Sequence, residues 1–207
     1  MSASCCNHTS EDQLRDSRYR RVLWAVLVIN GAMFLFEIIA GVAARSASLQ
    51  ADALDFLADA ANYGISLFVV GMALRYRASA ALTKGLTMGI FGLWVLVTSF
   101  LHVAYGTVPE AATMGAVGVA ALLANAASFA LLWAYRAGDS NMRSVWLCSR
   151  NDVIGNFAVL LAALGVFNSG KGWPDILVAI VMAGFALQGA WLVIRLALIE
   201  LQLRHAH

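Results

Sequence analysis

The chain has 207 residues, of which 61% are hydrophobic and only 13% are charged. A soluble domain carries about 25% charged residues, so this composition excludes an ordinary soluble protein and points to the bilayer as the solvent. The net charge of +2 is too small to suggest nucleic acid as a partner. The three cysteines form no pattern that predicts a disulfide framework.

Six apolar segments follow a polar stretch, and each can cross about 30 Å of hydrocarbon at about 1.5 Å per residue. Residues 1–21 are expected to form a cytosolic tail, and the first apolar segment is too long for a cleavable signal. The sequence predicts an all-α integral membrane bundle over 22–200, with 201–207 as a short cytosolic tail and no room for a further soluble domain. The predicted spans are 22–44, 47–74, 79–106, 111–135, 143–168 and 173–200.

Lysine and arginine placement predicts the orientation of these spans. With the N-terminus inside, the inner segments hold eleven basic residues and the outer loops hold two, Arg45 and Lys171. This bias follows the positive-inside rule, so both termini should be cytosolic in a multi-pass protein of the inner (cytoplasmic) membrane. The inner group is Arg15, Arg18, Arg20, Arg21, Arg75, Arg77, Lys84, Arg136, Arg143, Arg195 and Arg204.

The second segment carries three carboxylates on one helix face. At 100° per residue Asp52, Asp55 and Asp59 lie within about 60° of one another, and Asn62 extends the stripe. A charge at mid-membrane costs about 2.5–3.5 kcal/mol on insertion scales. Carboxylates this close need a cation or protons between them. The alternative is a polar contact between helices with the acids protonated.

The fifth segment repeats the spacing with Cys148 and Asp152, while Arg150 points to the other side of that helix. If the two helices face each other, Asp55, Asp59, Cys148 and Asp152 offer four oxygen and sulfur donors, the number that a tetrahedral Zn²⁺ site requires. The alternative for Cys148 is a small buried hydrophobic residue.

The N-terminal tail holds a second group of metal-binding residue types. Cys5, Cys6 and His8 place two thiols and an imidazole within four residues. They could capture an ion in the cytosol, or they could be part of a tail with no such role.

Residues 37–59 resemble the first-to-second helix signature of the cation diffusion facilitators. That signature has a Glu, a Gly, a Ser, an Ala-Asp pair and a His- or Asp-xxx-Asp motif, and the fifth helix of the family carries His-xxx-Asp. The matching positions are Glu37, Gly41, Ser46, Asp52, Asp55, Asp59, Cys148 and Asp152, with Asn125 matching a position of the fourth helix. Two departures are the cysteine in place of the usual His and the missing cytosolic C-terminal domain of the family.

The resemblance implies a homodimer that exports a divalent transition metal. Asp55, Asp59, Cys148 and Asp152 would bind the ion, and Asp52, Glu37, Asn62 and Asn125 would support the site or relay protons. Because binding needs deprotonated ligands, we expect proton-coupled efflux by alternating access. Zinc leads, since a thiolate favours softer ions, ahead of cadmium, cobalt, copper and mercury.

Other classes of function remain as alternatives. The first is a membrane accessory protein that captures metal through the tail motif and passes it to another exporter. An intramembrane hydrolase with paired aspartates is a weaker fit, because the acid stripe on one helix does not suit a catalytic dyad, and we do not expect an enzyme. No prosthetic group is predicted. The expected partners are the transported cation, protons, the lipid bilayer and a second copy of the chain.

Overall fold

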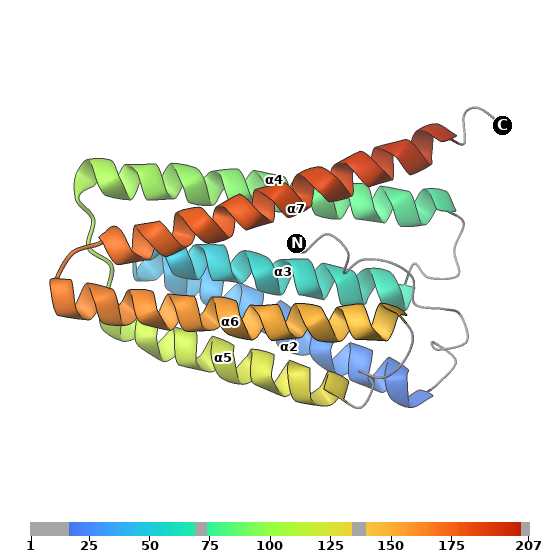
Figure 1. Cartoon of the computed structure of the whole chain (residues 1–207), viewed down its shortest axis with the longest axis horizontal. Helices are drawn as coiled ribbons and strands as arrows, with labels where there is room; N and C mark the ends of the chain where they lie inside the picture. Colours follow the sequence, from blue (N-terminus) through green and yellow to red (C-terminus); the bar gives the residue numbers. More distant parts are fainter. Residues whose placement is uncertain (1–16, 69–73, 134–139, 204–207) are drawn as a thin grey trace.

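The computed structural model describes the backbone of residues 17–68, 74–133 and 140–203, without the side chains of 17, 74–75, 77, 140–151, 154 and 202–203. In these ranges the chain forms six long α-helices and no strand (Figure 1). This confirms the predicted all-α bundle. The helices are α2 (Ser17–Ala43), α3 (Ala47–Phe68), α4 (Leu74–Tyr105), α5 (Ala111–Trp133), α6 (Ser140–Ser169) and α7 (Trp173–Leu203).

The helix ends differ from the predicted spans mainly on the inner side. Helix α2 begins at Ser17, so Arg18, Arg20 and Arg21 lie on its first turns and not in a separate tail. Arginine is a good helix former, and its long stem lets the charge reach the interface while the backbone stays helical. The described part of α3 runs to Phe68, and residues 69–73 of the predicted segment lie outside the described residues.

The bundle exposes large apolar side chains and buries several polar ones within a mostly apolar core, as suits a bilayer. Phe100, Leu123 and Trp191 are more than 60% exposed, whereas Glu37 and Asn156 are fully buried. Among the described residues, α2, α4, α5 and α7 each contain a stretch long and apolar enough to cross a membrane. Helices α3 and α6 carry the predicted site aspartates, and they run beside these four helices (Figure 1). The chain is therefore a multi-pass membrane protein.

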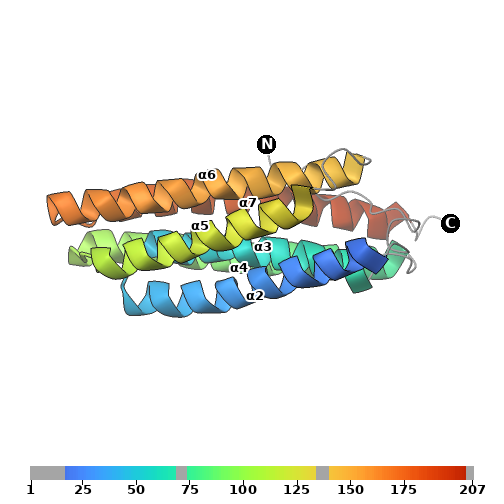
Figure 2. The same cartoon turned by 90° about the horizontal axis from the view of Figure 1, so that it is seen from below.

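Helix α3 lies at the centre and contacts every other described helix. The view in Figure 2 shows it between α6 and α2. Helices α4 and α7 pack along each other as a separate pair, and glycines on α4 allow the close approach. A Cβ atom at Gly85 would lie 2.8 Å from Cγ1 of Ile194, and one at Gly92 would lie 3.0 Å from Leu187.

One end of the bundle, where α3 begins, is predicted to face outward and is called the outer end below. Asp175 of α7 is fully buried there and accepts hydrogen bonds from the hydroxyls of Ser46 (2.7 Å) and Ser48 (2.6 Å). It also accepts the backbone N–H groups of Ala47 (2.8 Å) and Ser48 (3.0 Å). The first N–H groups of a helix have no partner within the helix, so the Asp175 carboxylate caps α3 from α7.

A second contact at this end joins α3 to α4. The indole Nε1 of Trp94 donates to Oε1 of Gln50 at 3.0 Å, and Nε2 of Gln50 donates to the backbone oxygen of Ser46 at 3.1 Å. Gln50 also packs tightly against α2, because a Cβ atom at Gly41 would lie only 3.0 Å from its Cγ. Four helices are thus tied together at the outer end.

Candidate metal centre

The carboxylates of α3 meet α6 in the interior of the bundle. Asp52 and Asp59 are 1% and 8% exposed, and Asp55 between them is half-buried. The spacing of three and four residues puts all three on the face of α3 that is turned inward. Asp152 enters from α6, half-buried, with its helix running alongside α3 (Figure 1).

Asp59 and Asp152 lie close to each other across these two helices, near enough for each carboxyl group to act on the other. The hydroxyl of Tyr63 donates to Oδ2 of Asp59 at 3.2 Å, whereas Oδ2 of Asp152 is buried without a described donor. Two carboxylates this close in a buried site cannot both stay ionised without a proton or a cation between them. The pair is therefore a place where a proton or a cation must sit.

Asp55 lies on the same side, one turn before Asp59. Its charge acts on Asp152, and its Oδ2 would lie 3.9 Å from a Cβ atom built at Gly155 of α6. The Asp55 carboxyl therefore lies close to α6. Among the side chains described, no three of the His, Cys, Asp and Glu type are grouped so that they could hold one ion together. Asp55 would have to approach the Asp59–Asp152 pair to share an ion with it.

The fourth predicted ligand and the tail motif fall outside the described side chains. Cys148 lies on α6, four residues before Asp152, but its side chain is not described, and neither is that of Arg150. Cys5, Cys6 and His8 are outside the described residues altogether. Their roles as ligands stay predictions.

A second carboxyl pair joins α2 to α3. Glu37 is fully buried and its carboxyl group lies close to that of Asp52. Both carboxyl oxygens of Glu37 and Oδ2 of Asp52 have no donor among the described groups. As in the first pair, two buried carboxylates this close need a proton or a cation between them. The structure thus brings together two of the four residues predicted to relay protons or support the site.

The other two predicted support residues lie apart from this pair. Asn125 is buried on α5, and in the described part of the chain no hydrogen bond links it to the five carboxylates. Asn62 extends the acid stripe as expected, but its Oδ1 accepts a hydrogen bond from Nζ of Lys84 on α4. Asn62 therefore connects the stripe to a cation.

Lys84 was expected only as one of the cytosolic basic residues. It is 8% exposed, and its charge acts on Asp59. The signal for this placement was available, since the apolar segment begins at residue 79 and Lys84 lies inside it. The position of Lys84 within an apolar segment did not indicate which residues of α3 it would contact.

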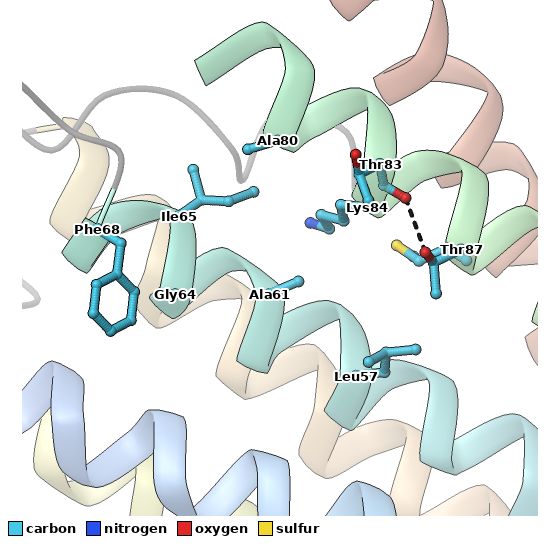
Figure 3. Close-up of a pocket in the computed structure, with 10 residues that line it drawn as sticks. Leu57, Ala61, Gly64, Ile65, Phe68, Ala80, Thr83, Lys84 and Thr87 are labelled. Carbon is cyan, nitrogen blue, oxygen red and sulfur yellow. Dashed lines mark hydrogen bonds between the residues drawn. The ribbon is translucent and has the colours of Figure 1, made fainter. Parts of the chain in front are cut away.

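Lys84 also lines a groove of about 440 Å³ between α3 and α4. Figure 3 shows its side chain extending from α4 into this space, with Ala61 and Ile65 of α3 on the opposite wall. The groove lies on the inner side of Asp59, because its α3 wall consists mostly of residues that follow Asp59 in the chain. The wall includes Leu57, Ala61, Ile65, Thr83, Lys84 and Met88.

Asp175 is the second residue whose role was not predicted. In the sequence it is an acidic residue that directly follows a proline at the start of an apolar segment. This context did not indicate a partner more than 120 residues away. A Ser-x-Ser sequence at the start of α3 marks a helix N-terminus that needs acceptors, and it is the only local signal for the contact.

Comparison with known proteins gives a consistent assignment. The cation efflux transmembrane domain matches residues 23–201. The metal cation efflux system protein CzcD of Cupriavidus metallidurans is 24% identical over 191 residues, 86% of this chain and 60% of the relative. The zinc transporter ZitB of Escherichia coli is 27% identical over 211 residues, 94% of this chain and 66% of the relative.

A cadmium, cobalt and zinc/H(+)-K(+) antiporter of Bacillus subtilis is 22% identical over 187 residues, 82% of this chain and 59% of the relative. The chain thus spans about three fifths to two thirds of the length of these relatives. The match of the family domain covers nearly the whole described bundle, including both helices of the carboxyl pair. The chain belongs to the cation diffusion facilitator family of metal transporters.

Proposed function

We propose that this chain carries divalent transition-metal cations out of the cytosol across the cytoplasmic membrane in exchange for protons, with zinc as the leading substrate. The observation that carries the proposal is the Asp59–Asp152 pair, held between α3 and α6 with Asp55 one turn away. Lipid-surrounded carboxylates that face one another are costly without a cation or proton to share. The relatives named above are metal-efflux proteins by name, which supports this class of substrate.

The proposed ligands are Asp55, Asp59, Cys148 and Asp152. Oxygen and sulfur donors from two helices suit Zn²⁺ and similar ions, which take four ligands at about 2.0–2.3 Å. The Asp59 and Asp152 carboxyls face each other across the two helices, so the proposed ion would bind between them. Binding would draw Asp55 toward this pair, and the helix contact at Gly155 leaves room for that shift.

Proton exchange follows from the same contact. An ion that binds between Asp59 and Asp152 must displace the proton that joins them, and that proton leaves to water on the side from which the ion came. When the site opens to the other side, protons from that side return to the carboxyls and the ion is released. The Glu37–Asp52 pair holds a second proton toward the outer end, where it could pass protons to the site.

We propose that the cation reaches the site from the inner end. The outer end is tied together by Asp175 and by the Gln50–Trp94 hydrogen bond, so the bundle is closed there. The groove between α3 and α4 lies on the inner side of Asp59 and has mostly apolar walls. In the alternating-access scheme, the next step would close this groove and loosen the outer end.

A vesicle assay tests the proposal. The purified protein is reconstituted in liposomes with a zinc-sensitive dye inside, and uptake is followed with and without a pH gradient. We expect the wild type to move zinc into the vesicles faster when the lumen is more acidic than the outside, because protons can then leave as zinc enters. Asp59→Asn and Asp152→Asn should reduce transport to the level of protein-free vesicles.

The matched control for these variants is Glu200→Gln, which makes the same chemical change at an exposed position of α7. It should transport zinc at the wild-type rate. Wild-type protein that moves none of the zinc, cadmium or cobalt ions would disprove the transport proposal. Equal zinc flux with and without the gradient would disprove the proton coupling alone.

A further inference from the structure

We propose that the ammonium group of Lys84, which Asn62 holds near Asp59, competes with cations for the proposed metal site and withdraws when a divalent ion binds. This inference rests on the proposed function, since it concerns the same site. It gives Lys84 a specificity role: a divalent ion can outcompete the ammonium group, and a monovalent ion cannot.

The first support is the position of Lys84 inside the membrane domain. A lysine at such depth is costly unless it has partners. Lys84 is 8% exposed and donates to Oδ1 of Asn62, which lies one turn after Asp59 on α3. Its charge acts on Asp59 itself. The ammonium group therefore lies at the inner edge of the carboxylate cluster.

The second support is the space around the side chain. The groove of about 440 Å³ between α3 and α4 extends beside Lys84, and Figure 3 shows the side chain reaching into it. A lysine has a flexible four-carbon stem and a compact charge, so it can withdraw along this groove without any movement of α4. The side chains of Thr83 and Thr87 lie on the same wall and offer hydroxyl oxygens as acceptors.

The positive charge of Lys84 sets a minimum charge for a cation that can bind at the site. The ammonium group and an incoming ion compete for the carboxylate of Asp59. A monovalent ion gains about the same Coulomb energy there as the charge that it displaces, whereas a divalent ion gains about twice as much at the same distance. With Lys84 in place, abundant monovalent cations should leave the site empty, and divalent ions should fill it at some loss of affinity.

The experiment measures zinc binding by titration calorimetry in lipid nanodiscs with and without about 0.1 M potassium, with choline chloride at the same ionic strength as reference. Lys84→Met removes the charge, Lys84→Gln removes the charge but keeps a donor to Asn62, and Lys84→Arg keeps the charge. The control is Arg195→Met, which removes an exposed positive charge from α7.

We expect Lys84→Met and Lys84→Gln to bind zinc about tenfold more tightly in choline, because a competing charge is gone. Potassium should then weaken their binding by at least roughly threefold, whereas the wild type, Lys84→Arg and Arg195→Met should not respond to potassium. In vesicles, the neutral variants should show a lower KM and a lower maximal rate, since tighter binding slows release.

The outcomes separate the two proposals. Wild-type protein that binds no zinc overturns the proposed function and this inference with it. Wild-type protein that binds zinc, with neutral Lys84 variants that bind it no more tightly and ignore potassium, overturns the role of Lys84 and leaves the proposed function standing. Lys84→Gln decides the question if Lys84→Met fails to fold.

Discussion

Replacing Asp175 by alanine would remove the acceptor that ties α7 to the start of α3. Four donors would lose their partner, two hydroxyls and two backbone N–H groups, at distances of 2.6–3.0 Å in the intact protein. Each such hydrogen bond contributes about 1–1.5 kcal/mol, so Asp175→Ala should lower the free energy of unfolding by about 4–6 kcal/mol. Asp175→Asn keeps one acceptor oxygen and should lose about half of that.

The assay is thermal unfolding of the purified protein in detergent, followed by the loss of the monodisperse peak in size-exclusion chromatography. For a chain of this size a loss of 4–6 kcal/mol corresponds to a fall of roughly 10–20 °C in Tm. The control is Glu200→Ala, which removes an exposed carboxylate from the same helix and should change stability by no more than about 0.5 kcal/mol.

A coupling measurement makes the test specific to the hydrogen bonds. Ser48→Ala should cost about 1 kcal/mol in the wild type and nearly nothing once Asp175 is already alanine, because the shared bond is then gone. The reasoning is refuted if Asp175→Ala unfolds at the same temperature as Glu200→Ala. It is also refuted if the costs of Ser48→Ala and Asp175→Ala simply add.

Three further predictions concern the packing and chemistry of the same helices. Gly155→Ala should bind zinc like the wild type, because the added Cβ atom meets Asp55 only at 3.9 Å. Gly155→Leu fills the space beside that carboxyl, so zinc binding measured by calorimetry should weaken by at least about tenfold. Gly85→Ala should destabilise the protein by about 1–3 kcal/mol in the thermal assay, because its Cβ atom would lie 2.8 Å from Ile194. The control Gly89→Ala should be close to neutral, because the nearest atom to its Cβ lies 3.8 Å away. Zinc affinity should fall as pH falls, because protons and metal compete for the same carboxyls, and wild-type affinity that stays constant between pH 8 and pH 6 would contradict a proton-sharing pair.

Most of the fold could be predicted from the sequence because lipid constrains it so strongly. A backbone inside hydrocarbon must satisfy its own hydrogen bonds, so long apolar segments can be read directly as helices. The helix ends were less predictable. The arginines at the start of α2, which is described from Ser17, are tolerated at the membrane interface, so hydropathy alone places the start of this helix too late.

The candidate site could be predicted in its residue types and faces but not in its pairings. The spacing of Asp55, Asp59 and Asp152 placed them on inward faces, and the structure joins Asp59 to Asp152. That Glu37 pairs with Asp52 depends on the packing of α2 against α3, which no local spacing reveals. The metal-ligand role of Cys148, the ion-capture role of the tail motif and the homodimer stay predictions.

Lys84 and Asp175 show what sequence reasoning lacks. Both act through partners on other helices: Lys84 through Asn62, 22 residues away, and Asp175 through Ser46, 129 residues away. A charged residue in an apolar segment can be recognised as needing a partner, but the identity of that partner is set by helix order and crossing geometry. The positive-inside rule placed Lys84 among the basic residues of the inner side, and its buried contact with Asn62 was not predicted.

The two ends of the bundle differ in a way that fits the direction of the first step. At the outer end, Asp175 and the Gln50–Trp94 contact join α3 to both α7 and α4 by hydrogen bonds that lose their value when stretched by even 1 Å. At the inner end, α3 and α4 are separated by the groove, and the described contact across it is Lys84 with Asn62. Because α4 and α7 pack closely along each other, a movement of that pair relative to α3 would change the groove beside Asp59 and strain the hydrogen bonds of Asp175 and Trp94. The ammonium group of Lys84 lies between the surfaces that would move.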